Sequence, residues 1–240
     1  VVVDEFQLKA RVSGVPGIKR ESIFHALNQK AVARRYAKSI GKKYEELNLI
    51  VVHLGGGISV GAHRKGLVID VNNALNGEGP ISPERAGTVP SEALATLCFS
   101  GKYTLNEVKK MLHGKAGLAA YLGTSDMITI EEKAIEGKEP YKTLVAAMDY
   151  TVAKEIGAMF VALKGQCDAI ILTGGIAYSD YCVADIKEQI EYLCKVVVLP
   201  GENEMESLAE NAFGALTGEL PVLTYTGVSC AEEIPGMAEA

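Results

Sequence analysis

A short apolar run that stops at three glycines is the strongest structural constraint in this sequence. Residues 49–54 (Leu-Ile-Val-Val-His-Leu) are rich in β-branched side chains and short enough for one buried strand, and Gly55, Gly56 and Gly57 follow at once. A turn without Cβ atoms lets the backbone approach a ligand closely and exposes N–H donors that suit phosphate oxygens. Val60 breaks a GxGxxG pattern and GxxxxGK(S/T) does not fit, so a phosphate site of another kind and a tight hairpin without ligand both stay open.

A second apolar strand ends in the same way. Residues 169–173 (Ala-Ile-Ile-Leu-Thr) precede Gly174, Gly175, Ile176 and Ala177, and a helix is expected to follow. These glycines lie at the carboxyl end of a predicted strand, where open α/β sheets bind their ligands. An ordinary strand-to-helix turn is the alternative, but two such turns in one chain favour a nucleotide site.

The remaining strand signals predict an α/β fold. Further strands are expected over residues 1–6, 58–62, 67–71 and 196–199. Tight connections between residues 49 and 71 predict an antiparallel meander. The order of strand, helix and strand from 169 to 199 instead favours a parallel, right-handed crossover. Residues 72–90 hold three prolines and three glycines without periodicity, so we expect a functional loop there.

Helices are predicted from apolar spacing and from capping residues. Ser22 is expected to cap the first helix, which Gly41 ends. Thr104 and Thr129 each precede a glutamate by three residues, which is the pattern of a capping box. The expected helices cover residues 22–40, 91–99, 104–112, 129–136, 141–164, 183–194 and a last one that Asn203 caps and that runs to Gly218.

Composition disfavours two classes of protein. With 48% apolar and 22% charged residues, and no apolar run near the ~20 residues of a membrane span, the chain is expected to be a packed soluble protein with no membrane partner. A net charge of −6 and scattered pairs of basic residues disfavour nucleic acid. Five cysteines without metal-type spacing predict reduced thiols and a cytoplasmic location.

Three residues are candidates for chemistry before any resemblance is considered. His53 ends the first apolar strand immediately before the glycines, where an imidazole can donate to a transferring phosphoryl group, although a buried core histidine is the alternative. The other three histidines have no comparable neighbours in sequence. Asp4 and Glu204 each lie just past a predicted strand, where a carboxylate can hold Mg²⁺ directly or through water. A solvated strand end and a favourable charge at a helix N-terminus are the respective alternatives.

Six segments, taken together, give the chain a specific resemblance. They are Val2–Phe6, His53–Val60, Asp70–Leu75, Gly79–Gly87, Ala120–Asp126 and Leu172–Ala177. From Val1 to about Gly218 the chain resembles the acetate and butyrate kinase family, which belongs to the superfamily of sugar kinases, heat-shock proteins and actin. Acetate kinases usually carry Asn where this chain has Gly56, and a different loop at residues 72–87, so the butyrate branch is favoured.

The resemblance implies reversible transfer of the ATP γ-phosphoryl group to butyrate or another short-chain or branched-chain fatty acid such as isobutyrate, giving an acyl phosphate and ADP. In the family's direct in-line route, the histidine at the His53 position stabilises the moving phosphoryl group, and the carboxylates at the Asp4 and Glu204 positions organise Mg²⁺ and the reactants. Gly55, Gly56 and Gly57 would cradle phosphate. The turn of Thr173, Gly174, Gly175, Ile176 and Ala177 would lie against the adenosine of ATP or ADP.

The same resemblance implies an actin-like (ribonuclease H-like) ATPase fold, an α/β architecture with a mixed sheet flanked by helices, mostly the second of two domains. Residues 1–48 are expected to be the end of the first domain and a connecting helix, and residues 49–206 the second, nucleotide-binding domain. Residues 207–220 would form a helix that returns to the first domain, and residues 221–240 a tail. A homo-oligomer is the family tendency.

Two departures from the family pattern bear on activity. Relatives begin earlier, with a strand, an Asn-Pro-Gly-Ser phosphate loop and a substrate-binding arginine, so we expect the printed chain alone to bind nucleotide weakly and to turn over little. Relatives usually place an arginine where this chain has Ile128, and Arg85 is a nearby candidate for the missing positive charge, unless it only fixes its loop. Acetate or propionate as the substrate, and a non-catalytic nucleotide-binding module, are the alternatives.

Overall fold

The structure, a computed structural model, describes residues 6–202, 204–220, 222 and 224. A mixed five-stranded sheet is its centre, with the strand order β3-β2-β1-β4-β5. The strands are β1 (Asn48–Leu54), β2 (Ile58–Arg64), β3 (Leu67–Val71), β4 (Ala169–Thr173) and β5 (Val196–Val198). β1, β2 and β3 pair antiparallel, whereas β4 lies parallel to both β1 and β5, which confirms the predicted meander and the parallel crossover.

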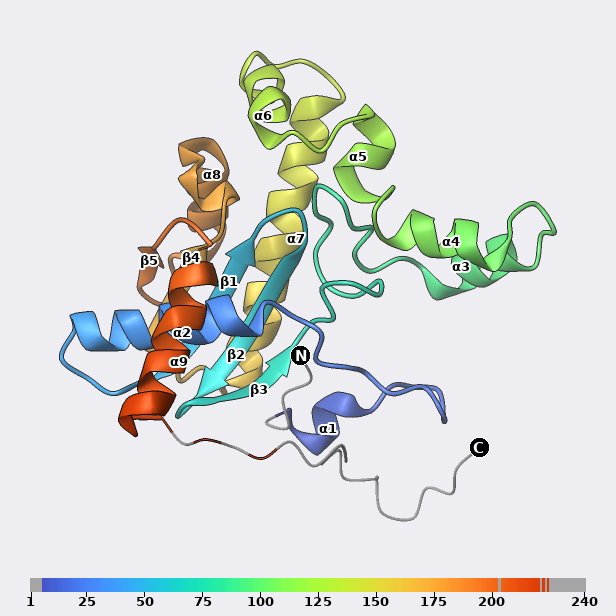
Figure 1. The fold of residues 1–240 in the computed structure, drawn as a ribbon. Coiled ribbons are helices and arrows are strands. Elements are labelled where there is room, and N and C mark those ends of the chain that lie inside the picture. The colour runs from blue at the N-terminus through green and yellow to red at the C-terminus, as the bar shows by residue number, and fades with distance from the viewer. Residues whose placement is uncertain (1–5, 203, 221, 223, 225–240) are drawn as a thin grey trace.

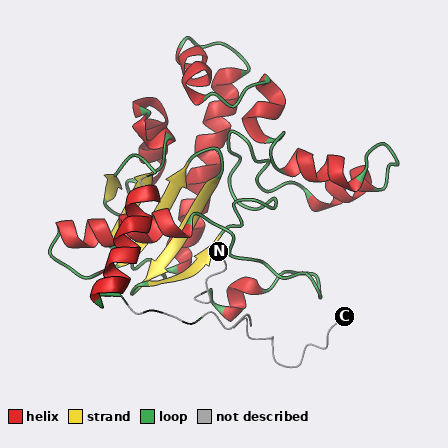
Figure 2. Cartoon of the chain, in the orientation of Figure 1, coloured by secondary structure: helices red, strands yellow, loops and turns green. Residues whose placement is uncertain are grey.

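Helices lie on both faces of this sheet (Figures 1 and 2). The α-helices are α1 (Leu8–Arg11), α2 (Ala26–Ser39), α3 (Ser91–Cys98), α4 (Leu105–Leu112), α5 (Gly117–Leu122), α6 (Met127–Ile135), α7 (Tyr141–Ala162), α8 (Asp180–Ile190) and α9 (Glu204–Thr217). Two short 3₁₀ turns, η1 (Tyr44–Glu46) and η2 (Ile176–Tyr178), precede β1 and follow β4. None of the helices in the described part of the chain combines the length and the apolar content that crossing a bilayer requires.

Strand β1 is buried along its whole length, and its alternating residues build two separate cores. Ile50, Val52 and Leu54 pack against α7 and α8 in the larger core. Leu49 and Val51 face the other way and pack with α2. Because side chains alternate along a strand, His53 shares the α2 face with these two residues. The period of the strand therefore directs the imidazole toward the N-terminal end of α2.

Several predicted caps differ from the structure. α2 begins after His25, not after Ser22, and the His25 side chain makes no capping hydrogen bond. The capping box at Thr104 is confirmed, but α6 begins earlier than predicted because Asp126, not Thr129, caps it. Helix α8 also begins earlier than predicted, at Asp180, because the Ser179 hydroxyl accepts a hydrogen bond from the backbone N–H of Cys182. The strand expected over residues 1–6 and the cap at Asn203 lie outside the described residues, apart from Phe6, which is in no strand.

The first part of the loop of residues 72–90 is anchored by side-chain contacts rather than free. The side chain of Asn72 accepts a hydrogen bond from the N–H of Val60 at 2.7 Å and donates one to the carbonyl of Ile58 at 3.1 Å. These bonds fasten the start of the loop to β2, just after β3 ends. Arg20 forms ion pairs with Asp70 at 3.2 Å and with Glu78 at 3.3 Å. Figure 1 shows the segment with α3 and α4 extending to one side of the sheet. The anchored loop passes beside the glycine turn after β1.

Candidate active site

Two histidines stack on each other at the carboxyl end of β1. His53 is the last residue but one of the strand, and the ring of His25, at the start of α2, lies parallel to it with 3.8 Å between ring centroids and 17° between planes. His53 is almost fully buried, with 2% of its surface exposed, while His25 is half-buried. The sequence reading chose His53 alone and missed His25, whose partner is 28 residues away along the chain.

Both rings are electrically neutral near pH 7. Burial, reinforced by the neighbouring His25, lowers the pKa of His53 to about 3. Burial also lowers the pKa of His25 to about 4, with a further contribution from the positive charge of Arg85. A neutral imidazole has one N–H donor and one acceptor, so which nitrogen carries the proton decides what each ring can bind.

Polar side chains from α2 hold the two rings. The Nδ1 atom of His53 lies 3.0 Å from Oδ1 of Asn28, and its Nε2 atom lies 3.9 Å from Oε1 of Glu202. The Nδ1 atom of His25 lies 2.8 Å from the hydroxyl of Ser59, which also accepts a hydrogen bond from the Gln29 amide at 2.8 Å. Sequence reasoning missed Asn28 and Gln29, because a buried amide in a helix gives no signal by type alone, and it missed Glu202, which is distant from His53 along the chain.

The glycine turn after β1 exposes backbone donors to this site. A Cβ on Gly55 would lie 3.1 Å from Nε2 of His53, and one on Gly56 would lie 3.3 Å from a carboxylate oxygen of Glu84. None of the three glycines has a positive φ, so the close packing of Gly55 against the His53 ring, not backbone conformation, is what favours glycine here. The N–H groups of Gly56 and Gly57 donate to no acceptor among the described residues. Two open N–H groups beside two imidazoles are suited to an anionic oxygen.

Arg85 lies on the anchored loop at the edge of the same turn. Its side chain approaches the place where a Cβ of Gly57 would be, at 3.9 Å, and its charge affects His25. One guanidinium nitrogen meets Oε2 of the neighbouring Glu84 at 3.4 Å, but the Nε atom is buried without a hydrogen-bond partner among the described residues. Both expectations for Arg85 therefore have support: it is tied to its loop and it retains a free donor near the histidines.

The second glycine turn lies against the first. Gly174 has φ +93°, and a Cβ there would collide with the carbonyl of Leu54. Gly174 also pairs with Gly201 after β5 through two backbone hydrogen bonds of 3.2 and 3.0 Å. The buried Thr173 hydroxyl donates to the Gly201 carbonyl at 3.1 Å, so its structural role is to fasten β4 to that turn. The carboxyl ends of β1, β4 and β5 thus meet at one edge.

A cavity of about 500 Å³ opens beside this second turn. Gly175, Ile176 and Tyr178 line one side, and Ile128 from the first turn of α6 lines the other. Ile128 is 73% exposed, which is a large apolar exposure for one side chain. The structure therefore places Ile128 at the rim of the cavity that the Gly174–Ala177 turn helps to form. Ala177 itself is buried beneath the turn.

The two proposed metal ligands fall where the structure gives no side chain. Asp4 lies outside the described residues, and for Glu204 only the backbone, as the first residue of α9, is described. Within the described residues no group of three His, Cys, Asp or Glu side chains could hold a metal ion. Glu202, in the turn just before Glu204, brings one carboxylate to His53. The described residues alone do not form a metal site.

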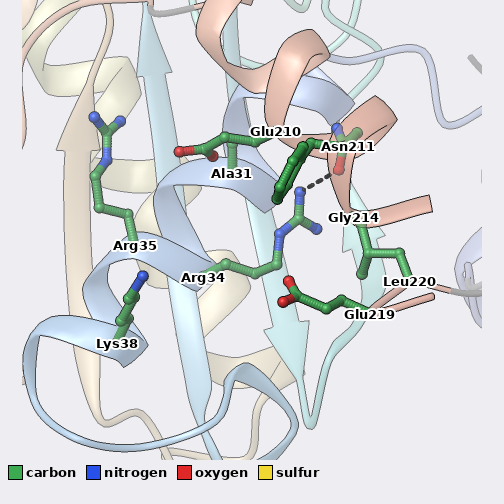
Figure 3. Close-up of a pocket in the computed structure, with 10 residues that line it drawn as sticks. Ala31, Arg34, Arg35, Lys38, Glu210, Asn211, Gly214, Glu219 and Leu220 are labelled. Carbon is green, nitrogen blue, oxygen red and sulfur yellow. Dashed lines mark hydrogen bonds between the residues drawn. The ribbon is translucent and has the colours of Figure 1, made fainter. Parts of the chain in front are cut away.

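A separate groove of about 720 Å³ lies between α2 and α9 (Figure 3). Arg34 extends toward α9 and donates to Oδ1 of Asn211 at 2.8 Å, whereas Arg35 extends away from it. Ala31, Lys38, Glu210, Phe213, Gly214, Glu219 and Leu220 complete its lining. The described lining of this groove includes none of the predicted site residues.

Comparison with known proteins agrees with the resemblance seen in the sequence. The model of the acetokinase family matches residues 5–213. A probable butyrate kinase of Phocaeicola vulgatus is 71% identical over 224 residues, which cover 93% of this chain and 63% of that protein. A probable butyrate kinase of Bacteroides thetaiotaomicron is 55% identical over 224 residues, covering 93% of this chain and 64% of that protein. The chain thus spans less than two thirds of the length of these relatives.

Solved structures show the same fold. The acetate kinase of Porphyromonas gingivalis superposes with a TM-score of 0.76 at 21% identity, over 87% of this chain and 60% of that one. A propionate kinase of Francisella tularensis gives a TM-score of 0.74 at 20% identity, over 84% and 59% of the two chains. The predicted actin-like fold with a mixed sheet is confirmed. With its family model matched over most of its length, the chain belongs to the acetokinase family.

Proposed function

We propose that the protein carrying this chain is a carboxylate kinase that transfers the γ-phosphoryl group of ATP reversibly to butyrate. A carboxylate oxygen of the acid attacks the γ-phosphorus, the bond from that phosphorus to the β,γ-bridging oxygen breaks, and an acyl phosphate and ADP result. Family membership and the two probable butyrate kinases among the relatives support this choice of substrate. Isobutyrate and other branched or short-chain acids belong to the same substrate class.

The stacked pair of His25 and His53 beside open backbone N–H groups is the observation that carries the proposal. Phosphoryl transfer needs positioning and charge stabilisation more than it needs a nucleophile from the protein. The N–H groups of Gly56 and Gly57 would hold phosphate oxygens, and Arg85 would add its free donor and its charge. The cavity at Gly175 and Ile176 would take the nucleoside.

The proposal includes the nucleotide, the metal ion, the division into domains and the assembly. ATP and ADP are the nucleotides, and Mg²⁺ would be held by Asp4 and Glu204, where it would neutralise phosphate charge. Residues 49–206 would be the nucleotide-binding domain, residues 1–48 would join it to the first domain, residues 207–220 would return there, and residues 221–240 would form a tail. A homo-oligomer in the cytoplasm, without nucleic acid or membrane partners, completes the proposal.

The test uses the protein that carries this chain, and traps the acyl phosphate with hydroxylamine in the presence of ATP, Mg²⁺ and a series of acids from two to five carbons. We expect hydroxamate with the highest kcat/KM for butyrate or isobutyrate. Replacing His25→Ala should lower the rate by about 100-fold or more, as removal of a donor to the transition state does. His113→Ala, at the end of α4, is the matched control and should leave the rate unchanged. Hydroxamate no higher than without protein, for every acid, would exclude the function.

A further inference from the structure

The two stacked rings are not equivalent in the hydrogen bonds that hold them. Both bind a protein group through Nδ1, but His53 meets an amide oxygen and His25 meets a hydroxyl. Neither Nε2 atom has a hydrogen-bond partner among the described residues, and neither is among the fully buried unpartnered atoms. Both Nε2 atoms therefore reach the solvent-accessible surface of the site. Whatever the site binds therefore meets two Nε2 atoms, and the protein side of each ring decides whether that atom carries a proton.

Asn28 fixes the proton of His53. Its Nδ2 group donates to the backbone carbonyl of Glu202 at 2.6 Å, and a carbonyl oxygen only accepts. The amide is therefore oriented with Oδ1 toward His53, 3.0 Å from Nδ1. An amide oxygen also only accepts, so Nδ1 of His53 carries the proton and its Nε2 carries a lone pair.

Gln29, the next residue of α2, fixes His25 in the opposite sense. Its Nε2 group donates to the carbonyl of Ser59 at 3.1 Å, which orients the amide, and it donates to the Ser59 hydroxyl at 2.8 Å. Ser59 is completely buried, so its hydroxyl proton needs an acceptor within the protein. Nδ1 of His25, at 2.8 Å, is the acceptor that the described residues offer. His25 then carries its proton on Nε2.

We infer that Asn28 and Gln29 are positioning residues that hold the stacked histidines in opposite tautomers, so that His25 presents an N–H donor to the site and His53 presents an acceptor. This rests on the proposed function for its catalytic meaning, because a donor can stabilise a phosphoryl oxygen and a lone pair cannot. His25 is then the ring that faces the phosphoryl group.

The packing around Asn28 and Gln29 holds both amides in these orientations. Gln29 is completely buried, and its Oε1 accepts from Nε2 of His63 at 2.9 Å, so every polar atom of the amide is used. Gly61 on β2 lies directly against it, and a Cβ there would collide with Oε1 of Gln29. Asn28 is equally enclosed, with 1% of its surface exposed. Turning either amide over would place its oxygen against a backbone carbonyl oxygen, which also only accepts, so the pattern is not reversed.

The direct test reads the tautomers of ¹⁵N-histidine-labelled protein near pH 7 by long-range ¹H–¹⁵N correlation spectra, which distinguish protonated from unprotonated ring nitrogens. We expect His53 protonated on Nδ1 and His25 on Nε2. Either ring showing the opposite tautomer overturns the inference. This measurement needs the unmodified protein only, so it decides the question even where a variant fails to fold.

Variants at Asn28 and at Ser59, the hydroxyl through which Gln29 acts on His25, then separate the supports of the two rings. Asn28→Ala should release the tautomer of His53 and leave His25 unchanged, while Ser59→Ala should do the reverse. Asn28→Asp retains an acceptor for Nδ1 and should retain the tautomer of His53. Asn211→Ala, an amide change on α9, is the control and should alter neither ring. An unchanged His53 spectrum in folded Asn28→Ala protein contradicts the role of Asn28.

Kinetics connect the tautomers to the proposed reaction. Ser59→Ala, which releases the tautomer of His25, should lower kcat by about tenfold or more with little change in the KM for ATP, because orientation of the donor ring is what is lost. Asn28→Ala, which leaves His25 unchanged, should lower kcat less. A purely structural role would not give a kcat loss that follows the tautomer. If the protein forms no acyl phosphate at all, the proposed function fails while the spectra still decide the tautomers.

Discussion

The buried carboxyl group of Asp149 should make the stability of this protein depend steeply on pH. Asp149 lies on α7 with none of its surface exposed, and neither of its oxygens has a hydrogen-bond partner among the described residues. Burial, strengthened by the negative charge of Asp185, raises its pKa from 3.8 to about 8, and the nearby Cys182 thiol opposes this only weakly. The group is therefore protonated in the folded protein at pH 7.

The sign of the effect follows from comparing the two states. Below pH 4 the carboxyl group is protonated whether the chain is folded or not. Between pH 4 and 8 the unfolded chain loses this proton and the folded chain keeps it, so the free energy of unfolding falls as the pH rises. At about 1.4 kcal/mol for each pH unit, the loss amounts to about 4 kcal/mol at pH 7 and about 5–6 kcal/mol at pH 8. This is comparable to the whole stability of many domains.

Replacement of Asp149→Asn removes this dependence, because an amide does not titrate in this range. Urea unfolding followed by circular dichroism at pH 5, 6, 7 and 8 should show the variant gaining stability over the unmodified protein, with a gain that grows at each step. Glu188→Gln makes the same acid-to-amide change on the exposed side of α8 and should give no growing gain. A difference between Asp149→Asn and the unmodified protein that stays constant from pH 5 to pH 8 would refute the reasoning.

Four further outcomes are expected. In the protein that carries this chain, Ile128→Arg should raise kcat for hydroxamate formation sharply if that cavity rim receives phosphoryl charge, and an unchanged rate excludes the position as a cause of low activity. Gly174→Ala combines a positive φ with a backbone collision and should lower the thermal midpoint by an amount worth at least about 2 kcal/mol. The sulfur atoms of Cys167 and Cys194 lie 3.2 Å apart, so a mild oxidant should join them, as mass spectrometry of the unreduced peptides would show. Burial lowers the pKa of His63 to about 3, so stability should also fall as the pH drops below about 6.5, and less so in a His63→Gln variant, which urea titrations at pH 4 to 6 would measure.

The sheet could be predicted from the sequence because its strands are short, apolar and separated by clear turns. β1, β4 and β5 appear close to their expected bounds, and the glycines after β1 and β4 do end both strands. Helix starts were predicted less well. Asp126 caps α6 by a local side-chain bond where the Thr129 pattern was chosen, and Ser179 caps α8, for which no cap was predicted. The short α5 was not expected at all, since its six residues carry little periodicity.

The candidate site could be predicted only in part, because sequence patterns report neighbours along the chain. Gly55–Gly57 and His53 were found since they are adjacent, and Gly174 since it repeats the pattern. Glu202 reaches His53 through the pairing of β4 with β5 and of Gly174 with Gly201. That contact depends on sheet order, which the sequence constrains only after the fold is known.

The start of α2 contains a signal that becomes readable once the helix is located. An N-cap position favours Ser, Thr, Asp or Asn, yet His25 occupies it and makes no capping bond. Asn28 and Gln29 follow as fully buried amides where an amphipathic helix would place apolar side chains. Each choice costs local stability, and all three lie within one turn. Departures from local preference that converge on one point are expected where side chains serve binding or catalysis, because a helix selected for stability alone would keep none of them.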